Sequence, residues 1–357
     1  MNGRRPAVLL LVTLAGCLRE QVADEVVDPY AGYDFVAYEP GDAPAPDVRA
    51  DRLCDESAAP AAAADKVFIH CRTEGARFVA EPAEPKHRLV VMTWNLERGQ
   101  RLDAQIAAFD NGAITVPDVL LVSEADRGCW RTGYRNVARE LAEALSYDYV
   151  FATEFVELPR PTADGTMSEP CEHGNAILSR YPIGNVEAVR HAQNFSWYGD
   201  AEEPRLGGRI ALVADIQVGG RYLHVASIHF ESSLTAVEII EAQAAETADI
   251  VGARPFGSIV GGDTNAPFYF IDLLHDKATD PATVPFFERG FVDTHDALPV
   301  AERGTRDGLI LDLLLMKPAY LRAQGPRICI EELCGALSDH LPVWAAFELD
   351  DTVGPAD

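Results

Sequence analysis

The chain has 357 residues, of which 48% are hydrophobic, enough for a large core in one or two domains. It carries 30 Lys and Arg against 56 Asp and Glu, a formal net charge of -26 at pH 7. Tight, non-specific binding of long DNA or RNA is therefore disfavoured, because such binding depends on basic side chains that neutralise phosphates.

The N-terminus has the pattern of an export signal. Arg4 and Arg5 precede an apolar run over residues 7–15, which is too short to span a bilayer as a helix. The run ends in Leu-Ala-Gly-Cys17, which resembles the lipobox of bacterial lipoproteins, although an ordinary signal peptide or a chance cysteine would also fit. We expect residues 1–16 to be removed and a lipid on Cys17 to anchor the exported protein in the bacterial cell envelope, at the periplasmic face or the cell surface.

Besides Cys17 the chain has six cysteines, an even number that is consistent with disulfides in an exported protein. Six cysteines allow fifteen pairings, and the sequence cannot choose among them. Nearest-neighbour pairing, taken as a first guess, joins Cys54 to Cys71 and Cys329 to Cys334 and leaves Cys129 with Cys171.

Residues 17–85 have no sustained hydrophobic period and are rich in Ala, Pro, Asp and Glu. This composition predicts a tether or an irregular extension rather than a packed domain. The aromatic residues Tyr30, Tyr33, Phe35 and Tyr38 are the exception, and we expect them to dock the segment onto the rest of the protein.

The pattern changes at about residue 86, where strands begin to alternate with a few helices. Gly219 and Gly220 separate two strands as a hairpin turn, which requires antiparallel pairing. We therefore predict a mixed α/β domain over residues 86–350, with helices covering the sheets, and a tail at residues 351–357. The expected strands are residues 89–95, 119–124, 176–178, 209–218, 221–230, 259–260, 309–316 and 343–349, and the expected helices are residues 101–110, 137–145 and 235–251.

One apolar strand is followed directly by two glycines and then by polar residues. Gly261 and Gly262 allow a sharp bend and the close approach of a ligand, and Asp263 and Asn265 come next. Taken alone, the segment is better explained as an ordinary turn, because Gly, Asp and Asn are common turn residues. Several other strands also end in a polar residue, which favours a site at which these ends meet.

An acidic residue, Asp312, lies inside the apolar run of residues 309–316. Burying an ionised carboxylate costs free energy unless a partner compensates for it. A structural salt bridge would meet this requirement, but His340 offers another partner. We expect Asp312 to hold His340 in one orientation and to stabilise its protonated form.

Three further strands end in residues that could serve a site. Asn95 ends the strand at residues 89–95 and Glu124 ends the strand at residues 119–124, and each alone is more simply a polar strand end. Together with Asp339 they offer the oxygen ligands that suit Mg²⁺. His229 closes another strand, where a histidine is commonly a core residue, although sites are often built at strand ends.

The polar strand ends described above belong to a series of short segments. In their order along the chain, over roughly residues 88–349, these segments resemble the endonuclease/exonuclease/phosphatase superfamily, the deoxyribonuclease I-like fold. The resemblance implies an α+β fold, a four-layer α/β/β/α sandwich of two mixed, mainly antiparallel sheets with all the motifs at one rim. The chain departs from the family at Ser123, where Gln is frequent, and at residues 310–313, where Arg-Ile-Asp-Tyr is frequent. The matching segments are Thr93-Trp-Asn-Leu96, Val122-Ser-Glu124, Gly174-Asn-Ala-Ile-Leu-Ser-Arg180 with Tyr181-Pro-Ile183, Ser227-Ile-His229, Gly261-Gly-Asp-Thr-Asn265, Phe291-Val-Asp-Thr294, Leu311-Asp312 and Ser338-Asp-His340.

The resemblance also implies roles for individual residues. Glu124 would be the main Mg²⁺ ligand, helped by Asn95 and Asp339. His340, held by Asp312, would take a proton from the attacking water or stabilise the phosphate.

Further residues would complete the site. The resemblance implies that His229 and Asn265 contact the phosphate oxygens and that Asp263 orients the nucleophile or assists the leaving group. Glu172 and His173, which precede the Gly174 motif, are additional candidates for the cleft.

The expected protein is an exported, metal-dependent phosphoesterase that hydrolyses a phosphodiester or phosphomonoester by in-line attack of activated water. Mg²⁺ is the expected cofactor, with Mn²⁺ or Ca²⁺ as alternatives, and we expect a monomer. The excess of acidic over basic residues favours a small-molecule or lipid phosphoester as the substrate. The alternatives are a secreted Mg²⁺-dependent nuclease and an inactive binding lipoprotein with the same fold.

Overall fold

The computed structural model describes residues 28, 30–41, 48–54, 69–81, 83–162, 164–232, 236–267 and 279–349. The expected signal segment at residues 1–16, Cys17 and the tail at residues 351–357 lie outside these residues, so the expectations for them stay predictions. Among the described residues, no helix combines the length and the hydropathy needed to cross a membrane.

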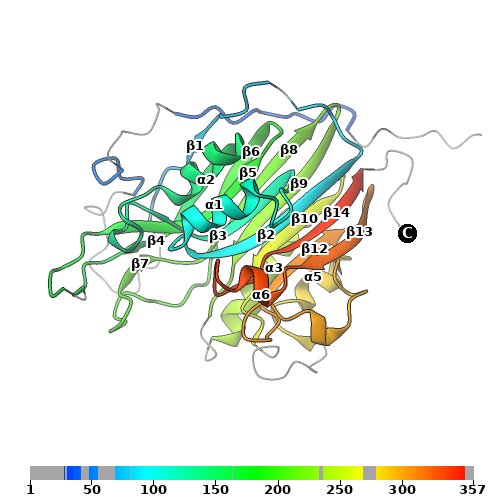
Figure 1. The fold of residues 1–357 in the computed structure, drawn as a ribbon. Coiled ribbons are helices and arrows are strands. Elements are labelled where there is room, and N and C mark those ends of the chain that lie inside the picture. The colour runs from blue at the N-terminus through cyan, green and yellow to red at the C-terminus, as the bar shows by residue number, and fades with distance from the viewer. Residues whose placement is uncertain are drawn as a thin grey trace, which may run out of the picture.

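Two β-sheets make up the centre of the protein (Figure 1). Within the described residues the first sheet has eight strands and the second has six. The first sheet contains, in spatial order, β1 (Glu74–Ala76), β4 (Asp148–Glu157), β5 (Cys171–Ser179), β3 (Val119–Arg127), β2 (Arg88–Arg98), β14 (Val343–Leu349) and β13 (Leu321–Ile328), with β7 (Arg205–Gly207) beside β4. The second sheet contains β11 (Val292–Asp293), β12 (Asp312–Lys317), β10 (Ser258–Asp263), β9 (Arg221–His229), β8 (Ile210–Val218) and β6 (Ile183–Arg190).

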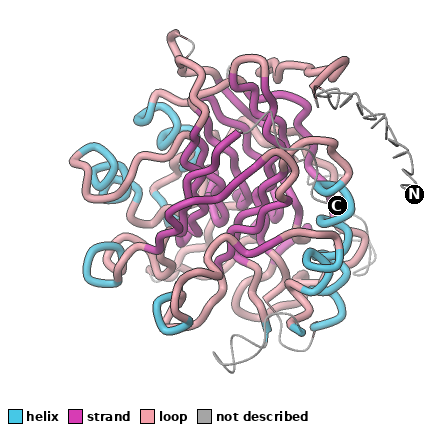
Figure 2. Tube along the Cα trace, turned by 90° about the vertical axis from the view of Figure 1, so that its right-hand side faces the viewer, coloured by secondary structure: helices cyan, strands magenta, loops and turns pink. Residues whose placement is uncertain are grey.

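Helices lie on both outer sides of the paired sheets, and Figure 2 shows the strands enclosed between them. α1 (Leu102–Asp110) and α2 (Val137–Leu145) pack on the first sheet, and α3 (Val237–Gly252) and α5 (Val284–Glu288) pack on the second. The short helix α6 (Glu331–Cys334) follows β13.

Alternating side chains along the strands build three hydrophobic layers. On β2, Leu89 and Val91 belong to the layer between the two sheets, whereas Met92 and Trp94 belong to the layer under α1 and α2. The outer face of the second sheet is buried in the same way beneath α3, which contributes Ile240. Three apolar layers separate four layers of secondary structure, so the predicted α/β/β/α sandwich of mixed sheets is confirmed.

Strand direction brings the ends of the central strands to one edge of the sandwich. β2 and β3 pair in parallel, as do β9 and β10, and their carboxyl ends therefore point the same way within each sheet. In the second sheet Asp263 is paired with His229 on one side and on the other with Asp312, the first residue of the antiparallel strand β12. The register thus places three predicted site residues next to one another.

Two glycines permit close contact beneath that edge. A Cβ atom on Gly261 would come within 2.8 Å of Cδ1 of Leu121 and 3.0 Å of Cβ of Thr93, both in the first sheet. Gly262 has a φ of 156°, and a Cβ atom there would lie 1.9 Å from the backbone oxygen of Ile228. The two glycines are therefore required by sheet packing and strand pairing as well as by the turn that follows.

The N-terminal extension packs against the domain where it is described, as an extension that docks rather than a free tether. Glu74–Ala76 form β1 and pair with β4. Tyr33 and Phe35 pack against Tyr222 of β9, with ring centroids 5.0 Å and 5.4 Å away, so the expected aromatic docking is confirmed. A three-residue strand produces no hydrophobic period, and the sequence therefore did not reveal the pairing of β1 with β4.

The guessed disulfide pairing is confirmed for the six cysteines that the structure describes. Cys54–Cys71 closes the N-terminal extension, Cys129–Cys171 joins the end of β3 to β5, and Cys329–Cys334 closes the loop that contains α6. Each bond restricts the unfolded chain and thereby stabilises the fold.

Several elements differ from those predicted. The strand expected at residues 309–316 begins only at Asp312, and the helix expected from residue 235 begins at Val237, while residue 235 itself lies outside the described part. β4 was not predicted, because Glu154 interrupts its apolar pattern and Asp148 and Glu157 stand at its ends, although all three are buried.

Gly261→Ala should lower the free energy of unfolding by about 1–3 kcal/mol, because the new methyl group must displace Leu121 or separate the sheets. Chemical denaturation with the disulfides intact measures this change. Gly220→Ala is the matched control: an added Cβ atom there meets nothing within 4 Å, so its effect should stay within about 0.5 kcal/mol. Equal stability of the two variants would contradict the close sheet contact.

Candidate active site

Asp312 and His340 form a buried pair. Nδ1 of His340 lies 2.7 Å from Oδ2 of Asp312, and the two side chains are 1% and 0% exposed. The indole nitrogen of Trp94 donates a hydrogen bond to the His340 carbonyl oxygen (3.0 Å), which fixes the backbone at that position. Burial acts to lower the pKa of His340, but the carboxylates of Asp312 and Asp263 outweigh it and raise the pKa to about 10. The structure thus joins the two residues that the sequence suggested as partners.

Asp263 stands between two histidines. Its Oδ2 lies 3.5 Å from Nε2 of His229 and 3.7 Å from Nε2 of His340. The same oxygen accepts a hydrogen bond from the side-chain amide of Asn95 in the first sheet (3.2 Å). Burial raises the pKa of Asp263 to about 7, with His340 opposing the shift and Asp312 reinforcing it. A carboxyl group that titrates near neutral pH can hold or release a proton during a reaction.

Asn265 fixes the turn after β10. Its φ is 46°, its backbone N–H donates to Oδ1 of Asp263 (2.9 Å), and its side-chain Nδ2 donates to the carbonyl oxygen of Phe230 (3.0 Å). The segment is therefore a tight turn, and it also holds Asn265 beside the end of β9, next to His229.

A buried ion pair lies behind His229. Oε2 of Glu154, in β4 of the first sheet, is 3.9 Å from Nδ1 of His229 and 3.4 Å from Nη1 of Arg209. Burial, with the nearby charge of Arg209, holds the pKa of His229 well below its ordinary value. The sequence analysis missed Glu154, although an acid inside a buried strand is the same signal that identified Asp312.

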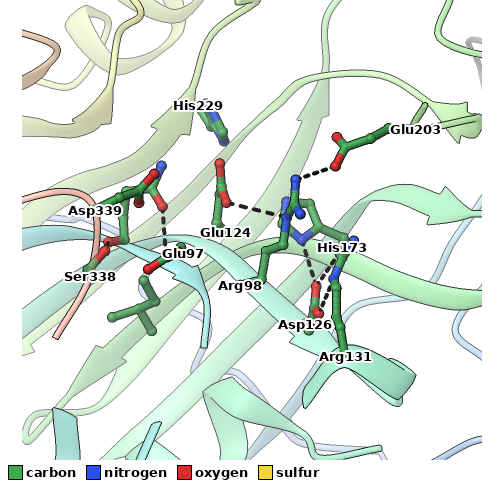
Figure 3. Close-up of polar contacts among 12 residues, drawn as sticks. Glu97, Arg98, Glu124, Asp126, Arg131, His173, Glu203, His229, Ser338 and Asp339 are labelled. Atoms are coloured by element: carbon green, nitrogen blue, oxygen red, sulfur yellow. Dashed lines mark hydrogen bonds and ion pairs between the residues drawn. The ribbon is translucent and has the colours of Figure 1, made fainter. Parts of the chain in front are cut away.

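Glu124 lies at an irregularity of β3 and is partly open to solvent. The pairings of β3 with β2 and β5 both shift register around it, its φ is 55°, and its side chain is 21% exposed. Burial acts to raise the pKa of Glu124, but His229, His173 and Arg98 hold it well below its ordinary value. In Figure 3 the carboxylate points toward His229, with Asp339 on one side and Arg98 on the other. Glu124 is therefore an ionised carboxylate that a ligand can reach.

The predicted metal ligands have the right chemistry for a hard divalent cation, which prefers oxygen donors. Glu124 accepts no hydrogen bond from another described residue, and its nearest cation is Nε of Arg98 at 3.9 Å. Among the residues that the structure describes, Oδ1 of Asn95 accepts only the backbone N–H of Glu97 (3.0 Å), and Asp339, which pairs with Arg306, is 36% exposed. The donor chemistry of the residues present thus suits a divalent ion.

A second group of ligand atoms lies deeper in the protein. Asp263, Asp312 and His340 each offer one ligand atom, and these atoms lie within 4.8 Å of one another. Asp312 and His340 already bind each other at 2.7 Å, so we interpret this group as a proton-holding cluster.

Glu172 and His173 point to opposite faces of β5, as neighbours in a strand do. Glu172 accepts a hydrogen bond from Nη1 of Arg127 (2.8 Å) on the side away from the site, which corrects the expectation that it lines the cleft. His173 lies beside Glu124 in Figure 3, and its Nδ1 is 2.9 Å from Oδ1 of Asp126.

Two arginines at the site were also missed. Arg98, from the end of β2, donates a hydrogen bond to Glu203 (2.5 Å), as Figure 3 shows. Arg306 comes from the loop before β12, and its Nη1 lies 3.2 Å from Nε2 of His340 while its Nη2 lies 2.9 Å from Oδ2 of Asp339. Arg98 ends a strand and Arg306 lies in a polar loop, and neither position carries a local signal of function, so only the fold places these two beside the site.

The family model described as "Endonuclease/Exonuclease/phosphatase family" matches residues 92–340. The matched region contains every predicted catalytic and metal-binding residue, from Asn95 to His340. No curated protein matches the chain.

Solved structures share the fold at low sequence identity. The endonuclease/exonuclease/phosphatase from Beutenbergia cavernae is 20% identical with a TM-score of 0.57, over 74% of this chain and 72% of that chain. The human Nocturnin catalytic domain with bound sulfate is 16% identical with a TM-score of 0.53, over 74% of this chain and 96% of that chain. Humanized D. rerio TDP2 is 18% identical with a TM-score of 0.51, over 73% of this chain and 99% of that chain.

The Asp312–His340 pair should make stability depend on pH. The pKa of His340 is raised from 6.5 to about 10 by folding, so its stabilising effect is complete below pH 6.5 and is lost as the pH rises through 10. Urea denaturation at several pH values, with a chelator present, should show a loss of a few kcal/mol that His340→Gln does not show. If the free energy of unfolding of both proteins fell equally with rising pH, groups other than His340 would cause the dependence.

Proposed function

The chain belongs to the Endonuclease/Exonuclease/phosphatase family, and from this we propose that it hydrolyses a phosphoester by in-line attack of water with the help of a divalent metal ion. Members of this family are hydrolases that act on phosphoester bonds. The observation that carries the proposal is that Oδ2 of Asp263 lies within 3.7 Å of His229, His340 and Asn95. These side chains come from both sheets, so pairing within one sheet does not explain why they meet.

Glu124, Asn95 and Asp339 would hold the ion, and we propose Mg²⁺. A bound ion of this kind supplies positive charge that stabilises the phosphate oxygens in the transition state.

Side chains of the protein would carry out the proton transfers. In hydrolysis a bond forms between phosphorus and the water oxygen while the bond to the leaving alcohol breaks, so water loses a proton and the leaving oxygen gains one. With a pKa of about 10, His340 held by Asp312 would be protonated at pH 7 and would stabilise the phosphate or give its proton to the leaving oxygen, whereas Asp263, with a pKa of about 7, would take the proton from the water. His229 and Asn265 would contact the phosphate oxygens.

We propose a small-molecule or lipid phosphoester as the substrate. The formal net charge of -26 repels a polyanion, and this argues against long nucleic acids. The arginines at the site do not form an open basic track, because Arg98 is paired with Glu203 and Arg306 with Asp339.

The purified protein should hydrolyse p-nitrophenyl phosphomonoesters or phosphodiesters with Mg²⁺, and a chelator should abolish the activity. His340→Ala should reduce kcat at least about 100-fold through loss of proton transfer, and Glu124→Ala should weaken activity and metal dependence together. Glu143→Ala, at an exposed position of α2, is the control and should retain activity. Unchanged activity of Glu124→Ala would overturn the metal assignment.

The same assays distinguish the proposed function from the two alternative functions. Rapid degradation of plasmid DNA under these conditions would favour a nuclease over the substrate class proposed here. A folded protein with no activity on any phosphoester would favour a binding lipoprotein.

We also propose that the protein is exported and anchored as a monomer through a lipid on Cys17. The disulfides support an oxidising compartment, since such bonds are rare in the cytosol. Cys17→Ser should therefore move the protein from the membrane fraction to the soluble fraction in cell fractionation. Membrane retention of this variant would contradict anchoring through Cys17.

A further inference from the structure

A cavity of about 920 Å³ opens beside the candidate active site. Its walls come from the loop before β12, from the end of β13 and from the segment around α6. Arg306 and Asp339 line this cavity and also contact the site, since Arg306 reaches both Asp339 and His340. The cavity therefore adjoins the candidate site through Arg306 and Asp339, and its size is that of a pocket for a small organic molecule.

Arg306 is well placed to move from its present partners to a phosphate. Its Nη1 is 3.2 Å from Nε2 of His340, the ring nitrogen that faces away from Asp312. Its side chain is 42% exposed and its ion pair is with Asp339, which is 36% exposed. Exposed ion pairs contribute little stability, so little is lost when Arg306 turns to a substrate. A guanidinium can also bind two phosphate oxygens at once.

The chemistry of the cavity walls limits what can enter. Leu298, Ile328 and Leu341 contribute apolar surface. The charged residues of the lining are unbalanced, with acidic side chains outnumbering basic ones. The acidic residues are Glu302, Asp307, Glu331, Glu332 and Asp339, and the basic residues are Arg306 and Arg327.

We propose that Arg306 binds the substrate phosphate and that the adjoining cavity holds the organic group of the ester, which is uncharged or cationic and carries no second phosphate. This inference rests on the proposed function and names the substrate class of the same site. The apolar walls favour burial of an organic group, while the excess of carboxylates disfavours a further anion. The cavity thus selects small phosphoesters over polyphosphates and nucleic-acid chains.

Two esters that differ by one phosphate test the selection. Thymidine 5′-(p-nitrophenyl phosphate) and its 3′-phosphorylated form release the same p-nitrophenol, and the added phosphate should lower kcat/KM about tenfold or more. Replacing two carboxylates, as Glu302→Gln with Glu332→Gln, should recover at least about threefold of that loss. Equal rates on both esters, or a loss that the double variant leaves unchanged, would overturn the proposed selection.

Filling the cavity tests whether it holds substrate. Ala301→Trp should raise KM severalfold for the thymidine ester, because the indole would occupy the cavity that Ala301 lines. Val300→Trp is the matched control, since Val300 is the preceding residue, is 41% exposed and does not line the cavity. Equal KM values in the two variants would place the organic group elsewhere.

Replacing Arg306 tests the phosphate contact. Arg306→Gln should lower kcat/KM at least about tenfold with unchanged thermal stability, and Arg306→Lys should restore part of the loss because it keeps the charge but not the paired donors. Arg289→Gln is the control: this arginine pairs with Asp249 of α3 and contacts no site residue. Full activity of Arg306→Gln would exclude the contact.

The result also separates this inference from the proposed function. If the protein hydrolyses neither ester nor any p-nitrophenyl phosphoester, the proposed function fails. If it hydrolyses them but the cavity variants behave like their controls, only the cavity assignment fails.

Discussion

The structure depends on the close contact between the two sheets beneath the active-site edge. Gly261 leaves no room for a side chain against Leu121, and the hydroxyl of Ser227 in the second sheet donates a hydrogen bond to the carbonyl oxygen of Val122 in the first (2.7 Å). Because both sheets carry a parallel pair at this place, strand ends that belong to different sheets are held within hydrogen-bond range. The hydrogen bond from Asn95 to Asp263 crosses the same interface.

The two sheets make different contributions to the site. The first sheet supplies Glu124, which is partly open to solvent, and Asn95, which is buried, and both offer oxygen atoms. The second sheet supplies His229, Asp263 and Asp312, whose register makes them direct neighbours. Neither sheet alone holds both the charge-neutralising and the proton-carrying groups, so the proposed chemistry requires the intact sandwich.

Burial and hydrogen bonding distinguish structural acids from reactive ones. Asp126 is fully buried and both of its carboxylate oxygens accept hydrogen bonds from Arg131 (2.7 Å each), which leaves it no capacity for a ligand. Glu124 is ionised, partly exposed and free of hydrogen bonds from described residues. Asp263 is buried among other titratable groups, and its pKa is raised to about 7. These three environments give one type of functional group three different properties.

The sequence alone determined the ordered strand ends, the buried acid in residues 309–316 and its histidine partner. The pattern of apolar and polar residues along a strand can be recognised in one sequence, and so can an acidic residue inside an apolar run, which needs a partner. It also indicated the sandwich through the family resemblance. The tertiary structure decided which side of β5 faces the site, so that His173 lies beside Glu124 while Glu172 binds Arg127. It alone brought Arg306 to the site and formed the adjoining cavity, because contacts between loops that are distant in sequence depend on how the sheets pack and leave no periodic trace in the chain.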